Sequence, residues 1–167
     1  MTLYMKQKVV AFTDRFTVTD EKGTPVYYVE GELLSLGKKL HISDAHGNRL
    51  ATVRQRLLTL LPKYSVEVEG EEVAEITKEF TLFKPSYKVK GPNWTVDGDI
   101  WDHDYHVRKG FDSIVHVSKA WLSWGDTYKI SIRKDINPVM AIAVVLAIDC
   151  VLDAEGEAAV RANNTEG

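Results

Sequence analysis

Residues 137–152 read Asn-Pro-Val-Met-Ala-Ile-Ala-Val-Val-Leu-Ala-Ile-Asp-Cys-Val-Leu, and this stretch decides the fold. Asn137 is a favoured N-cap residue and Pro138 is favoured in the first helical turn, so we expect a helix to begin here. Ten apolar residues then follow without interruption from Val139 to Ile148. Because no polar stripe is left for water to wet, this helix must be buried in protein or in lipid.

The length of the helix decides between these two environments. The fifteen residues from Pro138 to Leu152 span about 22 Å at ~1.5 Å each, which is short of the ~30 Å hydrocarbon core of a bilayer. Asp149 also interrupts the apolar run. We therefore expect a helix over about 138–152 at the centre of a protein core rather than a transmembrane span. A polar C-terminal tail is expected over 154–167.

The rest of the chain consists of short alternating runs separated by turn residues. Phe16–Thr19 leads into Asp20–Gly23, and Leu40–Ser43 leads into Asp44–Asn48. Gly, Asn and Asp supply the positive φ or the side-chain-to-backbone hydrogen bonds that tight turns need. Runs this short, at spacings of roughly 8–12 residues, predict an all-β sandwich or barrel.

A buried helix in an otherwise all-β chain needs a cavity about 10 Å wide. A closed antiparallel barrel of about twelve strands offers one, because barrel diameter grows with strand number. The sequence therefore predicts a mainly β protein in which residues 1–153 form a single barrel domain around the C-terminal helix. A barrel filled in this way has no lumen left for a lipophilic ligand, so a ligand is expected to bind outside the barrel or at its ends.

An internal repeat supports the same fold. Residues 53–66, 76–89 and 117–130 share a strand end, an apolar or aromatic pair, a turn and a Tyr-x-aliphatic ending. The copies are offset by 23 and 41 residues, and such unequal offsets argue against a solenoid or a propeller, which needs one fixed period. Because strand alternation puts each tyrosine on the face of the aliphatic residue that follows it, we expect the tyrosines to be core or rim anchors. These residues are Tyr64, Tyr87 and Tyr128.

Four segments carry a family resemblance. They are Phe16–Gly31 (FTVTDEKGTPVYYVEG), Leu40–Leu50 (LHISDAHGNRL), the stretch from Tyr87 to Asp99, and the apolar helix that ends in Asp149. Together they resemble the LURP-one-related family, within the tubby-like and scramblase-like superfamily, over nearly the whole chain. The resemblance implies a β-barrel threaded by its hydrophobic C-terminal helix. The motifs that carry it are structural rather than catalytic.

Composition and charge set broad limits on function. The 167 residues are 44% hydrophobic and 27% charged, with a net charge of −3. This balance is ordinary for a globular protein and lacks the basic excess of a dedicated nucleic-acid binder. The single cysteine, Cys150, cannot form an intramolecular disulfide and fits a reducing compartment. Met1–Lys8 does not have the pattern of a secretory signal, so we expect a cytoplasmic protein, peripheral at the membrane if it binds lipid.

The five histidines are the obvious place to look for a metal or an acid–base site. The densest group is Asp102, His103, Asp104 and His106, with His116 one strand later. On a regular strand His103 and His106 fall on opposite faces, so they could share an ion only through a bulge or a turn. The chain contains no Gly-x-Ser-x-Gly, P-loop or His-Glu-x-x-His motif. We expect neither an enzyme nor a cofactor, and a metal-assisted enzyme built on this group remains the alternative.

Apart from catalysis, the protein could still have a surface-binding role. Basic residues occur in the first two repeat copies, and tryptophans occur in the corresponding turn of the third. The basic residues are Arg54, Arg56, Lys63, Lys84, Lys88 and Lys90, and the tryptophans are Trp121 and Trp124. The last three lysines share strand parity and are expected to point outward together. The family resemblance implies headgroup binding, since tubby-like proteins bind phosphoinositides and scramblase-like relatives act at membranes.

Two interpretations of these residues stay open. In the first, the basic side chains attract anionic headgroups, at about 1 kcal/mol per residue near a charged surface, while the tryptophans insert at the lipid interface. In the second, they are ordinary solvent-facing charges that keep strands soluble and block edge pairing. The leading hypothesis is a non-catalytic tubby-like binding or scaffold module with an anionic phospholipid or phosphoinositide as its partner. A protein-interaction scaffold without a lipid ligand is the alternative, and no nucleic-acid partner is expected.

Overall fold

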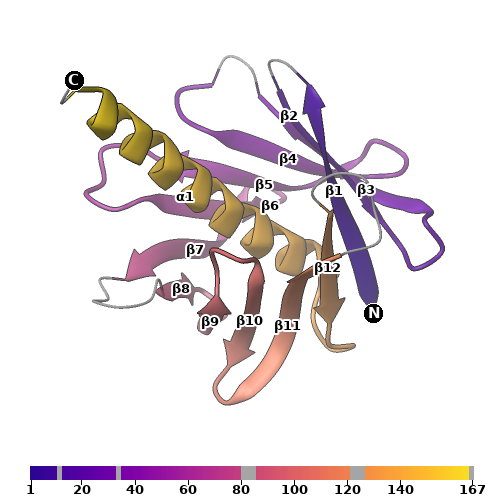
Figure 1. Cartoon of the computed structure of the whole chain (residues 1–167). Coiled ribbons are helices and arrows are strands. Elements are labelled where there is room, and N and C mark those ends of the chain that lie inside the picture. The colour runs from indigo at the N-terminus through magenta and orange to yellow at the C-terminus, as the bar shows by residue number, and fades with distance from the viewer. Residues whose placement is uncertain (11–12, 33–34, 80–85, 121–126, 166–167) are drawn as a thin grey trace.

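The structure is a computed structural model that describes residues 1–10, 13–32, 35–79, 86–120 and 127–165. Within these residues twelve antiparallel strands each pair with the next along the chain, and β1 pairs with β12 to close the sheet (Figure 1). The prediction of a closed antiparallel barrel is therefore confirmed. The strands are β1 (Thr2–Val10), β2 (Thr13–Thr19), β3 (Pro25–Gly31), β4 (Lys39–Asp44), β5 (Arg49–Arg56), β6 (Lys63–Val68), β7 (Glu71–Glu79), β8 (Ser86–Lys90), β9 (Trp94–Asp99), β10 (Asp104–Lys109), β11 (Asp112–Lys119) and β12 (Thr127–Ile132).

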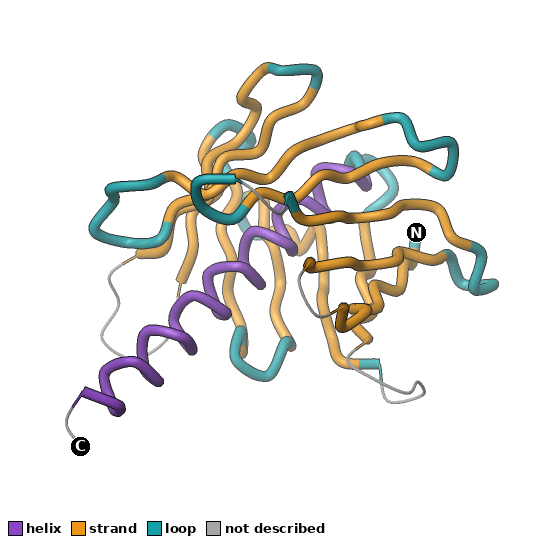
Figure 2. Tube along the Cα trace, turned by 90° about the horizontal axis from the view of Figure 1, so that it is seen from above, coloured by secondary structure: helices purple, strands orange, loops and turns teal. Residues whose placement is uncertain are grey.

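The helix α1 (Pro138–Thr165) runs through this barrel, as Figures 1 and 2 show. Its first turn is capped as the sequence predicts. The side-chain oxygen of Asn137 accepts hydrogen bonds from the backbone N–H groups of Val139 at 2.9 Å and Met140 at 3.3 Å. Residues 141–148 are each no more than 2% exposed. A helix that is apolar on every side is thus covered by the barrel wall on every side.

The wall supplies the other half of the core through strand alternation. In β8, for example, Tyr87 and Val89 are buried between helix and sheet, whereas Lys88 points to solvent. Tyr64 and Tyr128 are buried as well, which confirms that the repeated tyrosines are anchors of the core and its rim. The repeated tyrosine therefore occupies a similar buried packing position at three places in the barrel wall.

The end of the helix differs from the prediction. The sequence predicted a helix ending near Leu152 and a polar tail over 154–167, whereas α1 continues to Thr165. The change to polar residues marks the point at which the helix leaves the barrel, not the point at which it ends (Figure 2). Residues 153–162 contain four alanines and no proline, and alanine is the strongest helix former.

Two ion pairs fix the place where the helix leaves the barrel. Lys38 pairs with Asp153 at 2.8 Å, and Lys78 pairs with Glu155. We call this end of the barrel the exit rim and the opposite end, where α1 begins, the start rim. The exit rim comprises the described connections 32, 35–38, 57–62 and 100–103, and the start rim comprises 20–24, 45–48, 69–70, 91–93 and 110–111.

Candidate functional site

The outer wall formed by β4, β5 and β6 carries a hollow of about 230 Å³, which we call the wall hollow. Strand alternation produces it, because Leu40 and Ile42 of β4 point into the core and their neighbours point outward. Since α1 fills the lumen, this outer face is a place where a ligand can reach the protein. The ionisable residues that line the hollow are Lys39, His41, Arg49, Arg54, Glu67 and Glu69.

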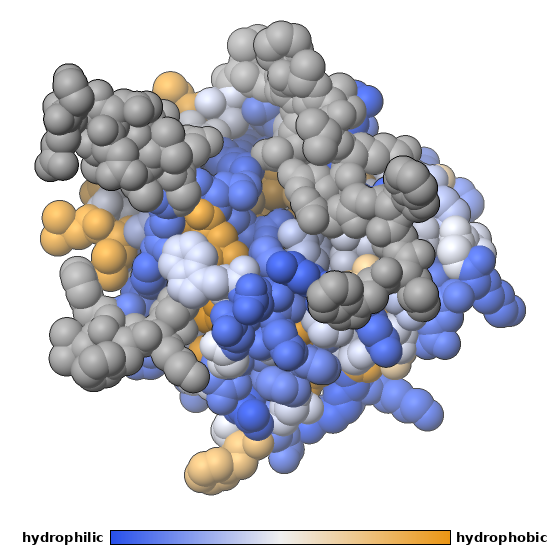
Figure 3. Space-filling model, in the orientation of Figure 1, coloured by the Kyte–Doolittle hydropathy of each residue, from blue (hydrophilic) through white to orange (hydrophobic). Residues whose placement is uncertain are grey.

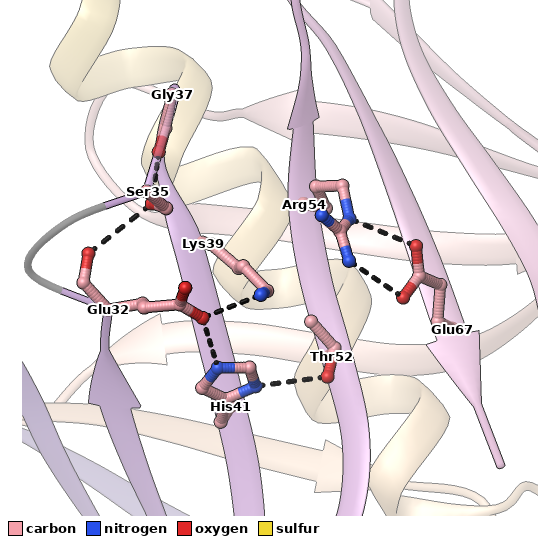
Figure 4. A network of polar contacts seen from close by, with 8 residues as sticks. All are labelled: Glu32, Ser35, Gly37, Lys39, His41, Thr52, Arg54 and Glu67. Atoms are coloured by element: carbon pink, nitrogen blue, oxygen red, sulfur yellow. Dashed lines mark hydrogen bonds and ion pairs between the residues drawn. The ribbon is translucent and has the colours of Figure 1, made fainter. Parts of the chain in front are cut away.

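Glu32 organises one side of the wall hollow (Figure 4). Its Oε2 accepts hydrogen bonds from Lys39 Nζ at 2.6 Å and from His41 Nε2 at 2.9 Å. Because an ionised carboxylate only accepts, His41 carries a proton on Nε2, and its Nδ1 lies 3.0 Å from the Thr52 hydroxyl. The bond from Lys39, followed by that from His41, lowers the pKa of Glu32 from 4.5 to about 2. Glu32 is therefore ionised at neutral pH and holds both side chains in place.

Two arginines line the wall hollow, and they differ in their ion pairing. Arg54 forms a two-pronged pair with Glu67, with Nε to Oε1 at 3.1 Å and Nη2 to Oε2 at 3.3 Å (Figure 4). Arg49 is exposed and makes no ion pair within the part of the chain that the structure describes. The hollow thus offers one guanidinium without an ion pair among the described residues and a second one held by a partly exposed carboxylate.

The predicted basic residues lie on the outer faces of β5 to β8, as strand parity requires, but carboxylates from neighbouring strands accompany them. We call these contacts the ion-pair ladder. Its pairs are Arg54 with Glu67 at 3.1 Å, Arg56 with Glu72, Lys63 with Glu75 at 3.9 Å, Lys88 with Glu79 at 2.5 Å, and Lys90 with Glu75 at 3.4 Å. The hydrogen bond from Lys88 is the main cause that lowers the pKa of Glu79. Five cations face four carboxylates, so the ladder carries little net charge.

Three further residues of the predicted site are not described. Lys84, Trp121 and Trp124 lie outside the described residues. Sequence reasoning also missed Glu32, His41 and the hollow that they border. The alternation of β4 signals that His41 points outward, but no local signal in the sequence pairs it with Glu32 on the far side of a connection.

His103 points toward the helix and away from the other histidines. It occupies the turn before β10 with a left-handed φ of 52°. Its ring lies 4.5 Å from that of Tyr128, and its Nδ1 is 3.7 Å from Asp149 Oδ1 of α1. His103 therefore belongs to the rim contacts of the helix.

His106 lies on the outer face of the barrel, across the sheet from this cluster. Its ring stacks on that of His116, with centroids 4.3 Å apart, and its Nδ1 is 2.8 Å from the Ser113 hydroxyl. His116 Nε2 donates to Asp104 at 2.9 Å. Burial, followed by the charge of His116, lowers the pKa of His106.

The four residues that the sequence offers as candidate metal ligands thus lie in two separate places. Asp102 and His103 lie in one turn, and Asp104 and His106 face the other side with His116. Among the described residues, no three His, Cys, Asp or Glu side chains are arranged to hold a metal ion. Within the same residues, no helix combines the length and the apolar character needed to cross a bilayer.

A closed twelve-stranded antiparallel barrel around a hydrophobic C-terminal helix is a tubby-like fold. The chain belongs to the LURP-one-related family, whose model matches residues 1–149. It is 37% identical over 150 residues to the protein YxjI of Bacillus subtilis, an alignment that covers 90% of this chain and 93% of YxjI.

A crystal structure of an Arabidopsis thaliana protein shows the same fold. It superposes with a TM-score of 0.62 at 15% identity and covers 89% of this chain and 90% of the plant chain. At that identity the likeness concerns the fold alone. The family and the fold together support a non-catalytic binding or scaffold module.

Proposed function

We propose that this protein is a non-catalytic module that binds phosphate-bearing lipid headgroups at the surface of anionic membranes, through the wall hollow. The filled lumen carries this proposal, because residues 141–148 are buried inside the barrel and a ligand is left with the outer wall or the barrel ends. On that wall, Lys39, Arg49 and Arg54 converge on one concave surface.

The arginines suit a phosphate chemically. A guanidinium presents a planar fork of N–H donors that binds phosphate oxygens in pairs. Arg49 has such a fork without a carboxylate partner among the described residues. The pair between Arg54 and Glu67 is exposed, and an exposed pair contributes only about 0–1 kcal/mol, so a phosphate can displace it.

The carboxylates around the hollow limit the strength of binding. Glu32 neutralises Lys39, and Glu67 and Glu69 also line the site. Each basic residue near an anionic surface contributes about 1 kcal/mol, so a single headgroup binds weakly and a membrane that presents many binds more firmly. The ion-pair ladder beside the hollow, including Lys88 and Lys90, adds secondary contacts.

Liposome co-sedimentation tests the proposal. Neutral phosphatidylcholine vesicles are compared with vesicles that also contain phosphatidylserine or a phosphoinositide, across a salt series. We expect binding that requires the anionic lipid, weakens with salt, and falls at least fivefold in the variant Arg49→Ala/Arg54→Ala. The matched control is Lys22→Ala/Lys134→Ala, which removes the same charge from exposed positions outside the wall hollow.

Three results would contradict the proposal. Equal loss in the control variant would show a response to net charge alone. Absence of binding to every vesicle would leave a protein-interaction scaffold as the function. A stoichiometric transition metal in protein purified without chelators, measured by mass spectrometry, would revive a metal-assisted enzyme.

A further inference from the structure

The exit rim exposes large apolar side chains at the tips of its connections. Leu58 and Leu60, between β5 and β6, are fully exposed, and Leu36, between β3 and β4, is 88% exposed. Leu57 and Trp101 are each about half exposed on the same rim. Apolar atoms protrude at the left edge of Figure 3, on the side where the β5–β6 connection lies in Figure 1.

The start rim is built differently. Two of its turns are closed by carboxylates: in the first, Asp20 accepts hydrogen bonds from the backbone N–H groups of Lys22 and Thr24 at 2.8 Å each. Asp44 does the same for the next turn along the sheet. Among the described residues of this rim, Phe111 is the large apolar side chain that is fully exposed. The two ends of the barrel therefore differ in polarity.

The β5–β6 connection holds one of its leucines in a strained conformation. Leu58 has a φ of 59°, in the left-handed region that bulky residues avoid. Its side chain is fully exposed, so no packing within the described chain offsets that strain. Leu57 lies against Gly37, where an added Cβ would approach its Cδ2 to 2.8 Å, and this contact joins the two leucine-bearing connections.

The geometry points to the exit rim as the part of the protein that enters a lipid bilayer, with Leu36, Leu58 and Leu60 seated in the interfacial region. This inference rests on the proposed function, because it assigns the end of the barrel that faces the membrane and so makes Lys39 and Arg54 the residues of the wall hollow nearest the headgroups. The leucines lie in the connections before β4 and between β5 and β6. Lys39 and Arg54 are at the end of the wall hollow nearest to them, whereas Arg49, Glu69 and Gly70 are at its other end, by the start rim. Arg56 and Lys63 flank the β5–β6 connection at the level where phosphates would lie.

A bilayer fits these leucines better than a protein partner does. They project separately from convex tips, and a fluid bilayer closes around such projections whereas a protein would need a matched pocket for each. Leucine is favourable in hydrocarbon but is under-represented among protein-interface hot spots. Asp153 and Glu155, where α1 leaves the barrel beside the exit rim, are already paired with Lys38 and Lys78, which reduces their repulsion by an anionic surface.

The test combines vesicle binding with a depth probe. Leu58→Ser/Leu60→Ser is compared with Phe111→Ser, which removes an equally exposed apolar residue from the start rim. Vesicles are phosphatidylcholine with phosphatidylserine, at low and high salt. We expect the leucine variant to lose about tenfold or more in vesicle affinity at both salt concentrations, because the lost contribution is hydrophobic, and the Phe111 variant to bind as the wild type.

An environment-sensitive fluorophore on Leu58→Cys provides the second readout, with Phe111→Cys as its control. The native Cys150 is buried, so the label reaches the introduced cysteine. We expect a blue shift on vesicle addition at position 58 and no shift at position 111. Vesicle binding with an unshifted probe at 58, or unchanged affinity of the leucine variant, would overturn this inference and leave the headgroup proposal standing. Failure of the wild type to bind vesicles would overturn both.

Discussion

Removal of one lumen side chain tests whether the helix is the centre of the core. Ile142 has no exposed surface, and Ile142→Ala deletes three carbon groups. At ~0.8 kcal/mol per buried group the loss of transfer free energy is about 2.4 kcal/mol. A residual cavity of roughly 40–80 Å³ adds about 1–2 kcal/mol at ~24 cal/mol per Å³. We therefore expect the free energy of unfolding to fall by about 3–4 kcal/mol.

Urea denaturation followed by far-UV circular dichroism measures this change. The midpoint is expected to fall with the slope unchanged, which separates lost stability from an altered denatured state. Ile142→Val serves as a milder step, with an expected cost of about 0.5–1.5 kcal/mol, if the alanine variant does not fold. Leu60→Ala, at a fully exposed position, should change stability by less than about 0.5 kcal/mol. A loss below 1 kcal/mol in Ile142→Ala would refute burial of the helix in the barrel.

Three further predictions concern the cap, one carboxylate and one turn. Asn137→Ala should lower the free energy of unfolding by about 1 kcal/mol in urea, because the first helical turn loses its cap; no change would contradict the cap geometry. The pKa of Glu32 is depressed from 4.5 to about 2, so its stabilising contribution is complete above pH 4.5 and is lost as the pH falls through 2. Melting temperatures of Glu32→Gln should therefore depend less on pH across that window than those of the wild type, and parallel curves would contradict this assignment. Gly91→Ala should destabilise more than Gly47→Ala in thermal melts: both glycines have positive φ, but a Cβ at Gly91 would lie 2.2 Å from a backbone carbonyl whereas Gly47 has open space, and equal losses would contradict the packing there.

The fold could be predicted from the sequence because its strongest signals are local. Asn137 and the uninterrupted apolar run after it specify a helix that needs complete burial, and alternating short runs specify the wall. The end of the helix at Thr165 could not be predicted from polarity. A change from apolar to polar residues reports exposure to water, and a helix can continue into water when alanine is frequent.

The candidate site was less predictable because it depends on register between strands. Strand alternation correctly predicts that Lys88 points outward, but it does not predict that Glu79 of β7 lies beside it. In the same way, Glu32 and His41 meet only because β3 and β4 pair in one particular register. Contacts of this kind are set by the whole barrel, so a single sequence without its fold overestimates the free positive charge of the wall.

The most direct test of the central claim is an amide NMR titration of the protein with soluble inositol trisphosphate. If headgroup phosphates bind the wall hollow, resonances of Arg49, Thr52, Arg54 and Gly70 should shift with a common saturation curve. Those of residues 141–148 in the filled lumen should stay in place. Shifts confined to the lumen helix or to the histidines of β10 and β11, or no saturable shift at all, would contradict the account.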